Sequence, residues 1–312
     1  MRSPGVAARH RDTALILAVG LLGISSGSVL AKLAGAAGVA SLTIAAWRLA
    51  VASLSLAPIG IATRLAELRS FSRKERALAL LSGVFLALHF ASWITSLRYT
   101  SVASSVVLVS SSPVFVAVLT FVFLREAVGH AMVLGIVLAL AGTAIIGWSD
   151  WSNAEAPRAF FGDLLALGGA AMIGCHFIAG RILRRRYSTL SYVTAVYPVA
   201  AVLLVVAALL SGEPLVAFRW GTCLLLVAVG MVPQVLGHTS FNHALRAAGA
   251  PLVALVSVGE PIGASLLALV ILGEPLRTAT LTGGALVILG ILVGAGLFGR
   301  KRRSVPGNGP NL

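Results

Sequence analysis

Ten apolar segments follow one another along the chain, and each is long enough to cross a lipid bilayer as a helix. A transmembrane helix needs roughly 20 mostly apolar residues. The composition agrees, because 58% of the 312 residues are hydrophobic and only 11% are charged, too few polar groups to cover a water-soluble surface. The segments are approximately 13–33, 41–62, 77–97, 102–124, 131–148, 162–181, 191–211, 221–242, 250–273 and 279–298. The sequence therefore predicts an all-α integral membrane protein with ten transmembrane helices.

The second half of the chain repeats the first at a constant offset of 148 residues, beginning at Leu97-Arg98 and Leu245-Arg246. Further matching positions are Pro113 and Pro261, Glu126 and Glu274, Gly135 and Gly283, and Gly142 and Gly290. Duplicated halves are typical of transporters, because halves that rock against each other open a site alternately to either side. Duplication can also simply build a scaffold, but transport is the favoured interpretation.

The apolar segments divide into two sets of five at a polar break between residues 149 and 161. This break contains Asp150, Asn153, Glu155 and Pro157, which are residues of turns and linkers. We therefore predict a first five-helix repeat over residues 1–150 and a second over residues 151–312.

Lysine and arginine are distributed unequally between the loops on the two sides of the predicted bundle, with 18 on one side and 5 on the other. The first side has Arg2, Arg9, Arg11, Arg64, Arg69, Arg73, Lys74, Arg76, Arg125, Arg181, Arg184, Arg185, Arg186, Arg246, Arg300, Lys301, Arg302 and Arg303; the second has Lys32, Arg98, Arg158, Arg219 and Arg277. Positively charged loops stay in the cytoplasm. We therefore predict a multi-pass protein of the inner (cytoplasmic) membrane with both termini cytoplasmic.

Five helices per repeat, an odd number, place equivalent residues on opposite sides of the membrane. Arg98 is expected outside and Arg246 inside, whereas Glu126 is expected inside and Glu274 outside. The repeats are therefore predicted to be inverted, related by a pseudo-twofold axis in the membrane plane. Inward-open and outward-open states can then be near mirror images.

Two stretches, 89–128 and 245–276, each combine small residues, a proline within the helix and a closing glutamate. Together with the ten-helix, two-repeat arrangement, they resemble the drug/metabolite transporter superfamily, specifically its bacterial EamA-type exporters. The resemblance implies secondary transport of amino acids and related metabolites, amphipathic cations or other small compounds. It also implies a central cavity lined mainly by helices 3, 4, 8 and 9, with contributions from helices 1 and 6.

Glu260 is the strongest candidate for chemistry, because an ionisable side chain near the bilayer centre costs roughly 3 kcal/mol on insertion scales and is usually functional. It lies between Gly259 and Pro261, where proline removes a backbone donor and predicts a break in helix 9. A carboxyl group here can carry a proton or act as counter-ion to a substrate ammonium; alternatively, it is protonated and bonded to a neighbouring helix. The first repeat has Ser111, Ser112 and Pro113 at this place, so the break is shared but the charge is not.

Two groups of polar residues are expected to line the cavity. In helix 3, His89 can bind substrate or relay a proton near neutral pH, and Trp93, one turn away, offers an aromatic face. In helix 8, Gln234, His238 and Asn242 recur every four residues and form a polar stripe that lipid would not tolerate. A lone histidine in a helix can equally be a packing residue with one hydrogen bond, so both alternatives stay open.

Arg48 lies within helix 2, near the expected end of helix 1 at Lys32. The two cations can together receive a carboxylate or phosphate, but a long cationic side chain near the end of a span can also simply extend to the interface. Elsewhere, the glycines of helices 5 and 10 are expected to form packing surfaces within the chain or a dimer face. We leave the choice between a monomer and a homodimer open.

Other classes of function fit less well. The net charge of +14 could suggest nucleic acid, but the basic residues lie in short clusters between apolar runs. The chain lacks HExxH and CxxC motifs, so neither a metal site nor an intramembrane enzyme is indicated, and no cofactor is expected. A nucleotide-sugar or sugar-phosphate carrier would want more fixed positive charge than Arg48 and Lys32 provide. The sequence favours export of small amphipathic metabolites, and amino acids, including aromatic ones, are the favoured class. The expected partners are the solute and the lipid bilayer.

Overall fold

The computed structural model describes residues 4–96, 98–100, 102–148, 156–216, 218–273 and 278–296. Leu97, Glu274, Arg277, the predicted boundary at residue 150 and the basic residues 300–303 lie outside this part of the chain. Within it, eight helices are long and apolar enough to cross a membrane, and two shorter apolar helices cover His130–Ile146 and Thr278–Gly294. These ten units confirm the predicted all-α membrane fold.

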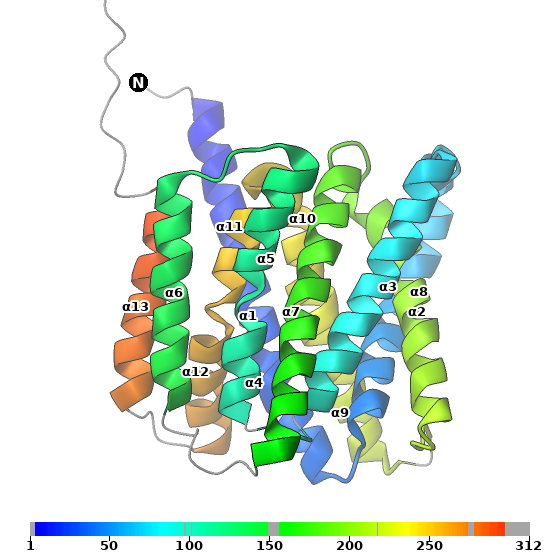
Figure 1. The fold of residues 1–312 in the computed structure, drawn as a ribbon. Helices are drawn as coiled ribbons and strands as arrows, with labels where there is room; N and C mark the ends of the chain where they lie inside the picture. The colour runs from blue at the N-terminus through cyan, green and yellow to red at the C-terminus, as the bar shows by residue number, and fades with distance from the viewer. Residues whose placement is uncertain are drawn as a thin grey trace, which may run out of the picture.

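The helices stand side by side as one bundle (Figure 1). Seven of the predicted spans are single helices, whereas the fourth, eighth and ninth are each divided into shorter helices. The undivided helices are α1 (Pro4–Ala36), α2 (Ser41–Arg69), α3 (Arg73–Ser96), α6 (His130–Trp148), α7 (Ala156–Arg184), α8 (Thr189–Leu210) and α13 (Thr278–Gly294).

The divided spans change geometry near the middle of their length. The fourth consists of α4 (Val102–Val109), α5 (Ser112–Leu119) and the π-helix η1 (Thr120–Leu124), and the ninth of α11 (Ala250–Ser257) and α12 (Glu260–Leu272). The prolines predicted these two breaks. The eighth span consists of α9 (Trp220–Val229), the π-helix η3 (Gly230–His238) and α10 (Thr239–Ala248). Its π-helix contains Pro233 and was not predicted.

Two antiparallel helix pairs reflect the inverted symmetry. In the first, α6 packs closely on α13: a Cβ added to Gly135 would lie 2.6 Å from the Gly290 carbonyl oxygen, and Gly142 faces Gly283 in the same way. Because position 135 corresponds to 283 and position 142 to 290, the two contacts are exchanged by the pseudo-twofold axis. The glycines of the fifth and tenth predicted spans, α6 and α13, therefore serve packing within the chain.

The second pair is α2 with α8, and an acid from each partner binds the beginning of the other helix. Glu213, just after α8, accepts a hydrogen bond of 3.0 Å from the backbone N–H of Thr43 in the first turn of α2. Glu67, near the end of α2, accepts from the backbone N–H and hydroxyl of Ser188, which precedes α8. Carboxylates at helix N-termini satisfy free N–H groups and the helix dipole. Both ends of this pair are thus fixed.

Between the two pairs lie two bundles, and each combines helices from both repeats. In the first bundle, α3, α4 and α5 of the first repeat pack against α7 of the second. In the second, α1 of the first repeat packs against η3, α10 and α12 of the second. The candidate site lies between these bundles.

Candidate functional site

A cavity of about 240 Å³ lies between the two bundles at the level of the helix breaks. Among the described residues, all ten predicted spans except the seventh and tenth contribute to its wall, so the second and fifth spans add to the six implied by the family resemblance. Its lining includes Ile24, Ser28, Arg48, His89, Phe90, Trp93, Val106, Val107, Val109, Ser110, Ser112, Thr143, Ile146, Ile173, Phe177, His238, Phe241, Ser257, Glu260, Pro261, Ala264 and Ser265. The wall is mostly apolar with a few polar groups, as in small-molecule sites.

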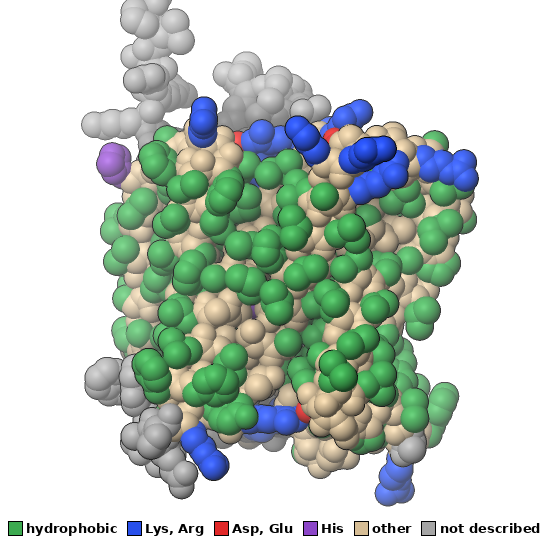
Figure 2. Space-filling view, turned by 45° about the vertical axis from the view of Figure 1, so that its right-hand side comes forward, with side chains coloured by type: hydrophobic (Ala, Val, Ile, Leu, Met, Phe, Trp, Pro, Cys, Tyr) green, Lys and Arg blue, Asp and Glu red, His purple; other side chains and the backbone are tan. Residues whose placement is uncertain are grey.

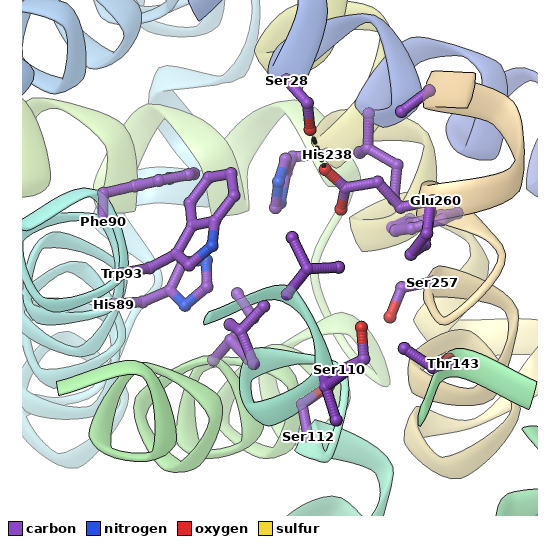
Figure 3. Close-up of a pocket in the computed structure, with 18 of the residues that line it drawn as sticks. Ser28, His89, Phe90, Trp93, Ser110, Ser112, Thr143, His238, Ser257 and Glu260 are labelled. Atoms are coloured by element: carbon purple, nitrogen blue, oxygen red, sulfur yellow. Dashed lines mark hydrogen bonds between the residues drawn. The ribbon is translucent and has the colours of Figure 1, made fainter. Parts of the chain in front are cut away.

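Aromatic rings from α3 form one wall (Figure 3). The rings of His89 and Trp93 are stacked with centroids 6.0 Å apart, and the rings of Phe90 and His238 form a T-shaped contact with centroids 5.5 Å apart. His89 Nδ1 donates to the backbone carbonyl of Gly169 at 2.9 Å. This bond leaves Nε2 of the neutral ring as an acceptor for a substrate group or a proton.

Arg48 is buried, with 4% of its surface exposed, so it does not extend to the membrane interface. Its Nε donates to Gln234 Oε1 at 2.8 Å, and its Nη2 donates to the carbonyl oxygen of Pro233 at 3.4 Å. The guanidinium carbon lies 4.4 Å from the centroid of the Phe90 ring, a cation–π contact. The structure thus places the guanidinium group in the cavity wall, and a role of Arg48 in substrate binding stays a prediction.

Glu260 is the first residue of α12 and faces the aromatic wall across the cavity (Figure 3). Ser28 of α1 donates a hydrogen bond of 3.2 Å to Glu260 Oε1. The described lining thus combines one carboxylic acid, one guanidinium, two imidazole rings and an aromatic surface.

The predicted site residues do not all reach the cavity. His89, Trp93, Ser112, His238, Glu260, Arg48 and Pro261 line it, whereas Ser111, Gln234, Asn242, Gly259 and Pro113 are not among its described lining residues. The Ser111 hydroxyl donates to the carbonyl of Leu108. Gly259 lies in the break between α11 and α12, and Pro113 lies in the first turn of α5.

The polar stripe of the eighth span is divided by the π-helix. His238 lines the cavity, whereas Gln234 is not among the described lining residues and its Oε1 accepts from Arg48 Nε. Asn242 Nδ2 donates to the hydroxyl of Tyr197 at 3.2 Å. A regular α-helix brings residues four apart onto one face, but a π-helix has a wider turn and rotates the following residues. The prediction that all three residues of this stripe line the cavity is therefore wrong for Gln234 and Asn242.

Sequence analysis missed several hydroxyl groups of the cavity. Ser110, Thr143, Ser257 and Ser265 line it, in positions close to Glu260 or on the facing helices. Small polar residues are common in tightly packed membrane helices, so their presence gave no signal that separates a cavity from a packing contact. Ser110 and Ser257 do lie next to the two helix breaks, and that position was a usable signal.

Comparisons with known proteins agree with the fold and the repeats. The EamA-like transporter family matches the chain twice, over residues 13–148 and 160–294. The chain is similar to YyaM of Bacillus subtilis, described as an uncharacterized transporter, with 25% identity over 274 residues, 81% of this chain and 84% of that protein. An uncharacterized transporter of Archaeoglobus fulgidus is 22% identical over 205 residues, 62% of this chain and 68% of that protein.

One solved structure has the same fold, with a TM-score of 0.78 at 20% sequence identity. The similarity covers 92% of this chain and 97% of the other. It supports the architecture and carries no information about the solute.

Proposed function

Because the chain belongs to the EamA-like transporter family, we propose that it is a secondary carrier that exports a small amphipathic solute by alternating access. The observation that carries this proposal is the cavity between the two mixed bundles, at the helix breaks of both repeats. A site at the interface of inverted repeats can be exposed to either side by rocking of the bundles. The excess of arginine on one face favours a cytoplasmic location for that face.

We infer that the solute is an amino acid, with an aromatic side chain favoured. Arg48 offers a guanidinium to a carboxylate, and Glu260 with Ser28 offers acceptors to an ammonium. The rings of α3 offer an apolar and aromatic surface to the side chain. A zwitterion would satisfy both buried charges at once, and leaving either charge unpaired in a membrane is costly.

The size of the cavity favours the same class of solute over the alternative. Pockets for drug-sized ligands are roughly 300–1,000 Å³, so about 240 Å³ suits a smaller molecule. A nucleotide sugar is larger and carries several phosphate charges, for which Arg48 is the one cationic side chain among the described lining residues.

Transport in proteoliposomes tests this function. Vesicles that contain the purified protein are loaded with labelled phenylalanine, tyrosine, tryptophan, leucine or a sugar phosphate, and efflux is measured with and without a pH gradient. We expect saturable efflux of the aromatic amino acids. Efflux of the sugar phosphate alone, or of none of these solutes, would contradict the substrate assignment.

Glu260→Gln tests the proposed role of Glu260 in proton coupling. The amide keeps the size of the side chain but cannot take up a proton, so we expect efflux that no longer responds to the pH gradient. Glu126→Gln is the matched control, because Glu126 forms an ion pair with Arg185 away from the cavity. If efflux by Glu260→Gln keeps the pH response of the unmodified protein, Glu260 does not carry the proton and His89 becomes the remaining candidate.

A further inference from the structure

The cavity reaches toward one face of the molecule and is closed toward the other. The arginine-rich face is formed by the α2–α3, α7–α8 and α10–α11 turns and is at the top in Figure 1; the opposite face is at the bottom. Basic side chains gather along the top edge in Figure 2. The cavity lining includes several residues of α4 and α12, whose labels lie low in Figure 1. By contrast, among the described lining residues, α11 supplies only Ser257, its last residue, and α5 only Ser112, its first.

The two bundles are packed together on the arginine-rich side. There α10 and α11 of one bundle contact α7 of the other, and α11 also contacts α5. Among the described residues, α4 and α12 do not pack together in the corresponding way on the opposite side. The structure therefore has the cavity closed toward the arginine-rich face.

Two arginines of α7 bind the carbonyl groups near the end of α10 across this contact. Arg181 Nη1 donates to the carbonyl oxygens of Leu245 at 2.8 Å and Arg246 at 2.7 Å. Arg184 Nε donates to the carbonyl oxygen of Asn242 at 3.1 Å. Of these three carbonyls, that of Arg246 lies in the last turn of α10, where carbonyl groups lack partners within the helix, and that of Leu245 also accepts from the N–H of Gly249. A cation is favoured at that end of a helix.

The Leu245 side chain of α10 also lies close to the α7 backbone at this point. A Cβ added to Gly180, next to Arg181, would lie 2.7 Å from Leu245 Cδ1. Gly249, with φ of 79°, makes the turn that ends α10 directly beyond the bound carbonyls. The contact is thus small, well packed and held by charge-assisted hydrogen bonds.

We propose that Arg181 and Arg184 are the gate that closes the cavity toward the arginine-rich face, by tying α7 of one bundle to the end of α10 in the other. This inference rests on the proposed function, because a carrier must separate the two bundles here to admit solute from that side. Separation breaks the three hydrogen bonds to α10, and solvent water then takes their place.

A neighbouring arginine provides the matched control. Arg185 forms an ion pair with Glu126, which follows η1. Because α7 and η1 belong to the same bundle, this pair does not cross the boundary between the bundles. Arg185→Ala removes one positive charge from the same turn, half the change made by Arg181→Ala/Arg184→Ala, and keeps the donors of the three hydrogen bonds to α10.

Thiol labelling tests the gate without any substrate. Cys175 and Cys223, which are free cysteines, are replaced by alanine, and Ser257→Cys places one thiol in the cavity wall. A membrane-impermeant maleimide is then applied to vesicles from the arginine-rich face or from the opposite face. We expect labelling mainly from the opposite face, and an increase of roughly tenfold from the arginine-rich face in Arg181→Ala/Arg184→Ala, since loss of such bonds shifts an equilibrium by about this factor.

The outcomes separate the gate from the transport assignment. Unchanged labelling from the arginine-rich face in the double variant, or an equal increase in Arg185→Ala, would overturn the gate. Arg181→Gln alone, which keeps the buried Arg184 in place, guards against misfolding of the double variant and should give a smaller increase. If labelling behaves as expected but no solute is transported, the gate stands and the proposed function fails.

Discussion

Arg48 makes three contacts of different kinds, and together they fix the direction of its charge. Gln234 and the carbonyl of Pro233 accept from two of its nitrogens, and Phe90 covers one face of the guanidinium. π-Helical turns are frequent at functional sites, and here the π-helix η3 supplies both acceptors. The cation is therefore positioned before a substrate arrives, which reduces the ordering that binding requires.

Arg48→Lys should weaken substrate binding although the charge is kept. Lysine lacks the planar group that lies on Phe90 and binds Gln234, and a hydrogen bond to a charged group contributes about 1.5–3 kcal/mol. We expect KM for the transported amino acid to rise roughly tenfold or more. The measurement is the concentration dependence of efflux, with Arg158→Lys, an exposed arginine outside the cavity, as the control. Equal KM values for the two variants would contradict this role.

Individual site residues were predictable from the sequence where burial of a charge alone identifies them. Glu260 and His89 were found because ionisable groups in a span are costly, whatever their neighbours. The hydrogen bond between Arg48 and Gln234 was not predicted. Regular α-helical geometry was assumed for the eighth span, and this assumption placed Gln234 on the cavity stripe. Arg181 and Arg184 were counted as loop charges, and nothing in the sequence shows that their donors bind α10.

At the scale of elements, close helix contacts depend on glycines from both repeats. A Cβ on Gly290 would lie 2.6 Å from the Gly135 carbonyl oxygen and 2.7 Å from the Ala139 nitrogen, both backbone atoms. Side-chain rotation cannot relieve such a contact, so α6 and α13 would have to separate. This pair is one of the two that flank the bundles.

Gly290→Ala should therefore destabilise the protein, by about 1–3 kcal/mol as for other overpacked sites. Gly168→Ala is the control, because a Cβ there has no neighbouring atom within 4 Å. Alanine is the better helix former by roughly 0.5–1 kcal/mol, so the control should be neutral or slightly more stable. Thermal unfolding in detergent measures both, and a Gly290→Ala protein as stable as Gly168→Ala would refute close packing of α6 on α13.

The elements themselves were largely predictable because the bilayer sets their length. Proline signalled the breaks before α5 and near Glu260, since it removes a hydrogen bond within the helix. The π-helix at 230–238 also contains a proline, but the sequence does not distinguish a break from a wider turn. That distinction depends on neighbours in space, such as Arg48, which binds the carbonyl of Pro233.

At the scale of the whole molecule, the inverted repeat relates the closed side of the cavity to the open side. Leu255 of α11 belongs to a buried cluster against which Ala117 of α5 packs, on the arginine-rich side of the breaks. The offset of 148 residues assigns Val107 to the place of Leu255 and Ser265 to the place of Ala117. Val107 and Ser265 both line the cavity in this state. If the two states are related by the pseudo-twofold axis, Val107 and Ser265 must come together when the opposite side closes.

Cross-linking can detect this approach. In a protein with Cys175 and Cys223 replaced by alanine, Val107→Cys and Ser265→Cys form a pair that a disulfide can join only at a Cα separation of about 4.4–6.8 Å. We expect slow oxidation in the present state. Oxidation should be faster when Arg181→Ala/Arg184→Ala releases the gate at the arginine-rich face, because the population of the state that is closed at the opposite face then rises. The pair Val107→Cys with Val118→Cys, an exposed position on α5, is the control. Equal oxidation rates with and without the gate substitutions would show that closing one side is not coupled to opening the other.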